Sequence, residues 1–190
     1  MTNSKPLFTI ITVCYNSEST LADTFNSVLS QSLRNFEYLV IDGQSTDSTL
    51  KVIKDFQPKF SQKGIQYHYI SEADSGIYDA MNKGLKLATG DVIGILNSDD
   101  LYANNSILNE VMTQFNNDLN LDILYGDLVY VKHDNINKIV RTWTSKPYYP
   151  NFFENGGVPP HPSLFVSARV YQEAGYFNLK YRLAADYEFM

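Results

Sequence analysis

Two adjacent carboxylates follow a short apolar run in the middle of the chain. Asp99 and Asp100 follow residues 92–96 after two polar residues, and the segment from Leu96 to Tyr102 reads Leu-Asn-Ser-Asp-Asp-Leu-Tyr. Neighbouring carboxylates at the end of a buried strand repel each other unless a cation or hydrogen-bond donors lie between them. Open α/β sheets bind their ligands at such strand ends. Asp99 and Asp100 are therefore candidates to hold a divalent metal ion and, through it, a phosphorylated substrate.

Apolar runs alternate with helical patterns along the first two thirds of the chain and predict the elements that position this doublet. Strands are expected over 8–15, 37–41, 65–70 and 92–96, and helices carry apolar residues at helical spacing around 21–29, 50–56, 77–88 and 107–115. Strands that alternate with helices in this way predict βαβ units, hence an α/β fold with a mostly parallel central sheet flanked by helices.

The pattern changes after Leu121. Residues 123–132 and 138–143 flank a polar turn and predict a small antiparallel β-hairpin. Residues 146–160 are rich in proline and predict a loop over the substrate cleft. A last strand is expected over 161–166, followed by a short helix over 167–177 that ends near a glycine.

Length and composition indicate a single domain, residues 1–190. With 190 residues, 44% of them hydrophobic, the chain can bury one good core. A net charge of −6 gives no reason to expect binding to nucleic acid or to an anionic membrane. The single cysteine, Cys14, excludes an intramolecular disulfide, suits a reducing compartment and lies among strand residues, which argues against a nucleophile.

The sequence gives two indications of the cellular compartment. No apolar stretch approaches the ~18 residues that span a bilayer, and residues 1–6 lack a signal-peptide core, so we expect a cytoplasmic domain. The chain stops at 185–190 without a capping signal, which resembles a domain cut at its C-terminal end. Peripheral association with the inner face of the membrane, through sequence missing after Met190, remains open.

Six segments of the chain resemble, in order and at family spacing, the motifs of the family 2 glycosyltransferases. They are 8–16 (FTIITVCYN), 40–47 (VIDGQSTD), 74–84 (DSGIYDAMNKG), 89–100 (TGDVIGILNSDD), 161–165 (HPSLF) and 185–188 (ADYE). The resemblance covers nearly the whole chain. It implies the GT-A fold and transfer of a sugar from a nucleotide-diphosphate donor with inversion at the anomeric carbon.

The resemblance gives the acidic doublet a specific role. Asp100 would coordinate the metal directly, and Asp99 would hold ribose hydroxyls or help the metal. Oxygen-only ligation next to a diphosphate selects Mg²⁺ or Mn²⁺ over zinc. The first of the usual acidic positions is Asn97 in this chain. The alternative for Asp100 is a cap of the following helix.

Four other residues would contact the donor's nucleoside. Tyr15 could stack on the nucleobase and Asn16 could hydrogen-bond it, the alternatives being a strand-end aromatic and its N-cap neighbour. Asp42 would accept hydrogen bonds from the base or serve as a turn aspartate. Asp74 stands where the family places a polar residue near the base and ribose. Asp47 is expected to be an N-cap instead.

The diphosphate side of the donor is less well supplied with cations. His161 could contact the diphosphate or cap a strand end. Many family members have an arginine where this chain has Met81, and Lys83 is either a phosphate contact or simply solvated.

One further residue is expected to act as the general base of the reaction. A single inverting displacement needs one carboxylate to take the proton of the acceptor hydroxyl. The resemblance assigns this role to Asp186, whereas Glu188 would point elsewhere. The alternative for Asp186 is an aspartate that starts a helix.

Three functions follow from this reading. The first is a metal-assisted, inverting glycosyltransferase that uses a UDP-sugar and a glycan or lipid-linked saccharide acceptor, as in bacterial cell-envelope polysaccharide biosynthesis. The second is a sugar nucleotidyltransferase, which would want a glycine-rich, basic loop that residues 14–17 lack. The third is a non-catalytic nucleotide-sugar-binding domain.

Overall fold

A computed structural model describes residues 8–190 of the chain, and residues 1–7, which include the N-terminal segment considered above, lie outside the described part. The strands are β1 (Phe8–Cys14), β2 (Phe36–Asp42), β3 (Gln66–Ser71), β4 (Val92–Ile95), β5 (Ile123–Leu124), β6 (Leu128–Lys132), β7 (Asn135–Trp143) and β8 (Phe165–Ser167). The helices are α1 (Leu21–Ser30), α2 (Thr49–Gln62), α3 (Ile77–Leu87), α4 (Ile107–Asn117), α5 (Ala168–Ala174) and α6 (Ala185–Phe189), with a 3-10 turn η1 (His161–Ser163).

A six-stranded sheet in the order β3-β2-β1-β4-β8-β5 forms the centre of the described structure. Strands β1 to β4 run parallel to one another, so their carboxyl ends meet at one edge. At that edge Cys14 of β1 lies opposite Asp42 of β2, and Asp42 lies opposite Ser71 of β3. The predicted α/β architecture with a mostly parallel sheet is confirmed.

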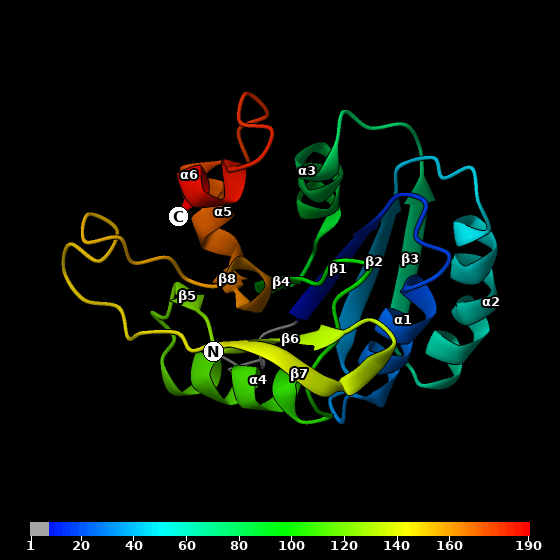
Figure 1. Ribbon diagram of the computed structural model, residues 1–190, viewed down its shortest axis with the longest axis horizontal. Helices are drawn as coiled ribbons and strands as arrows, with labels where there is room; N and C mark the ends of the chain where they lie inside the picture. The colour runs from blue at the N-terminus through cyan, green and yellow to red at the C-terminus, as the bar shows by residue number, and fades with distance from the viewer. Residues whose placement is uncertain (1–7) are drawn as a thin grey trace, which may run out of the picture.

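Helices cover both faces of this sheet, because successive strand residues point to opposite sides and both sets are apolar. Helices α1, α2 and α4 pack on one face, and α3, α5 and α6 pack on the other (Figure 1). An aromatic cluster anchors the first face around the fully buried Phe25, whose ring lies 5.8 Å from Tyr38 and 5.2 Å from Phe56. This double layer makes the parallel strands a rigid support for the loops at their carboxyl ends.

Two details of the predicted topology are wrong. Ile123–Leu124 does not extend the hairpin but pairs with β8 at the edge of the main sheet, so the hairpin consists of β6 and β7 alone. The last strand does not begin at His161, because residues 161–163 form a 3-10 turn. Pro162 has no N–H to donate to a ladder, and the Ser163 N–H donates to Pro160 O at 2.9 Å. The strand therefore starts at Phe165.

The helix predicted after this strand is confirmed, ending at Ala174 before Gly175, whose φ of +90° suits a residue without a Cβ. Across the described residues we find no helix with both the length and the apolar character needed to cross a bilayer.

Candidate active site

The loop after β1 presents an exposed aromatic ring next to a strained backbone. Tyr15 is 63% exposed, and Asn16 adopts a left-handed φ of +49°, which asparagine tolerates better than most residues. The Asn16 side-chain oxygen accepts a hydrogen bond from the Thr46 N–H at 2.9 Å. The backbone N–H of Asn16 donates to Ser45 Oγ at 2.8 Å. Asn16 therefore joins the β1 and β2 loops, and its amide NH₂ is the part left for a nucleobase.

Asp42 ends β2 and is fully buried. Its carboxylate accepts hydrogen bonds from the hydroxyls of Ser45 and Ser71, both at 2.5 Å, so it ties the loops after β2 and β3 together. The Cys14 Sγ lies 3.8 Å from Asp42 Oδ1, and burial raises the pKa of this thiol, which keeps it protonated and unreactive. The nucleobase contact of Asp42 stays a proposal, because the carboxylate is turned toward protein donors.

Tyr15 and Asp74 converge on Gly43, although they come from loops after different strands. A Cβ built at Gly43 would overlap Asp74 Oδ2 and would lie 3.4 Å from Tyr15 Cδ2. The other oxygen of Asp74 accepts a hydrogen bond from the Gly76 N–H at 2.9 Å. The structure thus brings together an aromatic ring, a bare backbone and a carboxylate at the carboxyl edge of the sheet, the groups that a nucleoside would need.

Lys83 is neither a free phosphate ligand nor a simply solvated side chain. Its ammonium lies 3.0 Å from Glu72 Oε1 and donates to Ala73 O at 2.6 Å, so it fixes the loop that carries Asp74. Met81, at the position where many family 2 glycosyltransferases have an arginine, is only 2% exposed and belongs to the core under α3.

Asp47 closes the loop after β2. Its carboxylate accepts hydrogen bonds from the N–H groups of Thr49 and Glu18, at 2.9 and 3.1 Å. The N-cap of α2 is Ser48, so the prediction that Asp47 is the N-cap is wrong by one position. The contact with the Thr49 N–H still satisfies a free donor at the start of α2.

The acidic doublet, Asp99 and Asp100, lies in the loop that follows β4. Asp99 is exposed and Asp100 is partly buried. Burial raises the pKa of Asp100, and the neighbouring Asp99 charge raises it further, while a 3.1 Å hydrogen bond from Asn97 Nδ2 opposes the rise. Ser98 Oγ lies 2.9 Å from Ser17 Oγ, which joins this loop to the one after β1. The doublet is therefore an electrostatically unfavourable arrangement in the absence of a counter-charge.

The chemistry of this loop fits a hard divalent cation. Asn97 Oδ1 is buried and has no hydrogen-bond partner among the described residues, so this oxygen can accept a hydrogen bond or coordinate a cation. No group of three or more His, Cys, Asp or Glu side chains in the described structure could hold a metal by itself. Mg²⁺ commonly takes one or two carboxylates and completes its shell with substrate phosphates and water. The doublet matches that mode.

Asp186 lies near the start of α6, where it meets α3. The Tyr78 hydroxyl donates to Asp186 Oδ1 at 2.6 Å, which places Asp186 beside the first turn of α3. Glu188 is exposed, and its nearest described polar contact is Asn178 Nδ2 at 3.4 Å. The two acids therefore face different surroundings, as expected from the sequence.

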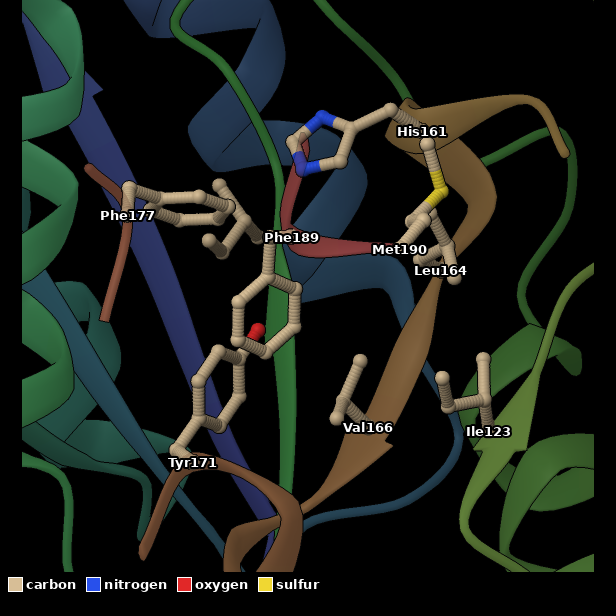
Figure 2. Close-up of a pocket in the computed structure, with 9 residues that line it drawn as sticks. Ile123, His161, Leu164, Val166, Tyr171, Phe177, Phe189 and Met190 are labelled. Atoms are coloured by element: carbon tan, nitrogen blue, oxygen red, sulfur yellow. The ribbon is translucent and has the colours of Figure 1, made fainter. Parts of the chain in front are cut away.

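His161 begins η1 and faces an apolar corner. Its ring lies 5.9 Å from that of Phe177, and Figure 2 shows it above Phe189 and Met190, with Tyr171 and Val166 lower in the view and lining the same pocket. Burial lowers the pKa of His161, although the nearby Asp186 charge acts in the opposite direction. The cavity here measures about 10 Å³, which is room for about one water and none for a sugar. Contact of His161 with the diphosphate stays a proposal.

The sequence model of the family "Glycosyl transferase family 2" matches residues 9–169 of the chain. The chain belongs to this family. A PGL/p-HBAD biosynthesis glycosyltransferase of Mycobacterium bovis is 29% identical over 184 residues, which cover 97% of this chain and 68% of the relative.

Two solved structures share the fold of this family 2 domain. S. aureus TarS 1-349 in complex with UDP has a TM-score of 0.73 at 20% identity, over 96% of this chain and 53% of that chain. The mannosyltransferase PcManGT from Pyrobaculum calidifontis, in complex with GDP-Man and Mn²⁺, has a TM-score of 0.67 at 17% identity, over 93% of this chain and 48% of the other. The present chain thus spans about half the length of either chain, and the expected GT-A fold is confirmed.

Three features of the family 2 site escape the sequence analysis. They are the Tyr78–Asp186 hydrogen bond, the Ser17–Ser98 link and the close approach of Asp74 to Gly43. Tyr78 and Gly43 fall inside the quoted motifs, so a sequence signal exists for their importance. The partners, however, are separated by up to 108 positions, and nothing local in the sequence pairs them.

Proposed function

We propose that this family 2 domain is an inverting glycosyltransferase that moves a sugar from a UDP-sugar to a saccharide hydroxyl with the help of Mg²⁺ or Mn²⁺. The observation that carries the proposal is the acidic doublet at the carboxyl end of β4. Asp100 is partly buried beside a second carboxylate, and no described Lys, Arg or His forms an ion pair with either. Two neighbouring carboxylates repel each other when both are ionised, and a bound cation removes that repulsion.

The donor would lie across the carboxyl edge of the sheet. Tyr15 and Asp74 flank the open backbone at Gly43 and would contact the nucleobase and ribose, together with Asn16 and, if it turns outward, Asp42. Asp100, assisted by Asp99, would hold the metal, and His161 would contact the diphosphate. When bound, the metal would supply Lewis-acid stabilisation of the charge that builds on the departing diphosphate.

Asp186 would act as the general base. In one displacement the acceptor oxygen forms a bond to the anomeric carbon, the bond from that carbon to the diphosphate oxygen breaks, and the hydroxyl proton passes to Asp186. UDP leaves with the electron pair of the broken bond, and the configuration of the sugar inverts. No covalent intermediate on the protein is required.

The acceptor is proposed to be a growing glycan or a lipid-linked saccharide of the bacterial envelope, met at the cytoplasmic side of the membrane. Tyr148 and Tyr149, in the loop between β7 and η1, are 65% and 41% exposed and offer aromatic faces on which a sugar ring can stack. These rings pack beside Phe152, at 5.9 and 5.3 Å, which orders them for such a contact.

Calorimetry can test the donor half of the proposal. UDP is titrated into the purified chain with MnCl₂, with MgCl₂ and with EDTA, and uridine is titrated as a matched ligand without the diphosphate. We expect UDP to bind tightly only with metal and uridine to bind equally weakly in all three buffers. Metal-independent UDP binding would contradict the role of the doublet.

The two alternative functions give different products. A nucleotidyltransferase would release pyrophosphate from UTP and a sugar 1-phosphate, whereas a glycosyltransferase releases UDP from a UDP-sugar. A binding domain would show UDP affinity and release neither product. Measurement of UDP and pyrophosphate from the same enzyme preparation separates the three functions.

A further inference from the structure

A hydrogen bond joins two segments that are 108 positions apart, directly at the proposed base. Tyr78, the second residue of α3, donates its hydroxyl proton to Asp186 Oδ1 over 2.6 Å. The other carboxylate oxygen, Oδ2, has no hydrogen-bond partner among the described residues. One oxygen of Asp186 is therefore fixed by protein and the other is left for a ligand.

The frame around this contact is rigid. The Asn82 side chain, one turn after Tyr78 on the same face of α3, accepts a hydrogen bond from the Phe177 N–H at 2.9 Å and donates to Phe177 O at 2.8 Å. Asn82 is only 6% exposed, so both bonds are shielded from water. The Phe177 ring lies 5.5 Å from the Tyr78 ring. Residues of α3 thus hold the segment that leads into α6.

We propose that Tyr78 is a positioning residue that fixes the Asp186 carboxylate with Oδ2 free to accept the proton of the incoming hydroxyl. This inference rests on the proposed role of Asp186 as general base. A hydrogen bond to Oδ1 restricts rotation about the Cβ–Cγ bond, so the free oxygen keeps one direction in the unliganded enzyme. Correct placement of a catalytic group contributes strongly to rate, because small misplacements are costly.

The electrostatics of the pair agree with this arrangement. Burial and the Asp186 charge raise the pKa of Tyr78 to about 12, so the hydroxyl keeps its proton and remains a donor at neutral pH. The donor also faces a carboxylate, which makes the bond charge-assisted and stronger than one between neutral groups. Glu188, two residues further along α6, has no comparable partner, which separates its role from that of Asp186.

The variant Tyr78→Phe tests the proposal, because it removes the hydroxyl and keeps the ring that packs on Phe177. The matched control is Tyr67→Phe, which removes a buried hydroxyl that donates to Ile53 O at 3.0 Å on the opposite face of the sheet. The readouts are UDP release from UDP-glucose and UDP-N-acetylglucosamine with MnCl₂ and water as acceptor, the Kd for UDP, and the Tm.

We expect Tyr78→Phe to lower kcat by about tenfold or more while the Kd for UDP stays unchanged, since positioning of a reacting group affects only the chemical step. The control should lower the Tm and leave kcat unchanged. A wild-type kcat in Tyr78→Phe would overturn the proposal. A parallel loss of kcat and UDP affinity would overturn it as well, since it would indicate a structural role.

Two further measurements keep the outcomes distinct. Asp186→Asn should abolish UDP release; full release in that variant would refute the base itself, whereas an inactive Asp186→Asn beside a fully active Tyr78→Phe would refute only the positioning role. Crystal structures of the wild type and Tyr78→Phe decide the matter if release is too slow to follow. We expect Asp186 to occupy more than one rotamer only in the variant, and one shared rotamer would overturn the inference.

Discussion

Replacement of Asp100 by asparagine should make the free domain more stable and the liganded domain less stable. Burial and the Asp99 charge raise the pKa of Asp100, so the ionised carboxylate destabilises the folded state at neutral pH. Asparagine removes that charge and can still accept the hydrogen bond from Asn97. The Tm of Asp100→Asn without ligand should therefore equal or exceed that of the wild type. Asp134→Asn, an exposed hairpin position with the same change in charge, is the control.

The effect of ligand should have the opposite sign. Metal and UDP at a hundred times their Kd stabilise a protein by about 2.7 kcal/mol, which for a chain of 190 residues corresponds to a rise in Tm of about 5–11 °C. Loss of a direct metal ligand that weakens binding about a hundredfold would reduce the gain to about 0.4 kcal/mol, or roughly 1 °C. Thermal unfolding with UDP, with and without MnCl₂, measures both values. An undiminished ligand-induced rise in Asp100→Asn would refute the metal role.

Three other predictions concern packing and pH. Gly43→Ala should weaken UDP binding by about five- to tenfold in calorimetry, because the new Cβ displaces the Asp74 carboxylate and about one hydrogen bond is lost; Gly126→Ala, which meets no atom within 4 Å, should bind UDP normally. Gly84→Ala places a Cβ 2.6 Å from an isoleucine of β1, and overpacking of about 1–3 kcal/mol, offset by about 1 kcal/mol of helix propensity, should lower the Tm. Burial lowers the pKa of His161 from its ordinary 6.5, so the unfolded chain binds that proton more tightly and stability falls as pH drops below 6.5. Urea unfolding at pH 7.5 and 5.5 should show a smaller loss in His161→Gln than in the wild type, and equal losses would contradict this reasoning.

The parallel half of the fold was predictable because its signals are local. β1, β2 and β4 are buried on both faces, so each is a mostly apolar run that can be recognised without its partner strand. Their helices show one apolar stripe each, and the βαβ rule then gives the order and direction of the strands. The acidic doublet was found for the same reason, since its position follows from the end of one such run.

The antiparallel end of the sheet was less predictable because its pairings depend on tertiary contacts. β5 has only two residues, and its pairing with β8 spans about forty positions of intervening hairpin and loop. Pro162 delays the start of β8, because it has no N–H for the strand ladder. The Ser163 hydroxyl then donates to Gly126 O at 2.8 Å and holds the 3-10 turn in place. Neither the partner strand nor this contact leaves a periodic signal in the sequence.

The charge distribution at the carboxyl edge explains why we expect the metal to be a requirement for donor binding rather than an accessory. Asp74 follows β3 and the acidic doublet, Asp99 and Asp100, follows β4, at the edge where we propose that the donor binds. The whole chain carries a net charge of −6. Lys83, the lysine of α3 that contacts the loop carrying Asp74, is already paired with Glu72. A diphosphate brought to this edge without a counter-ion would therefore be repelled by these carboxylates. A divalent ion reverses the sign of the local field, so the same acids that repel the free nucleotide become the reason that its metal complex binds.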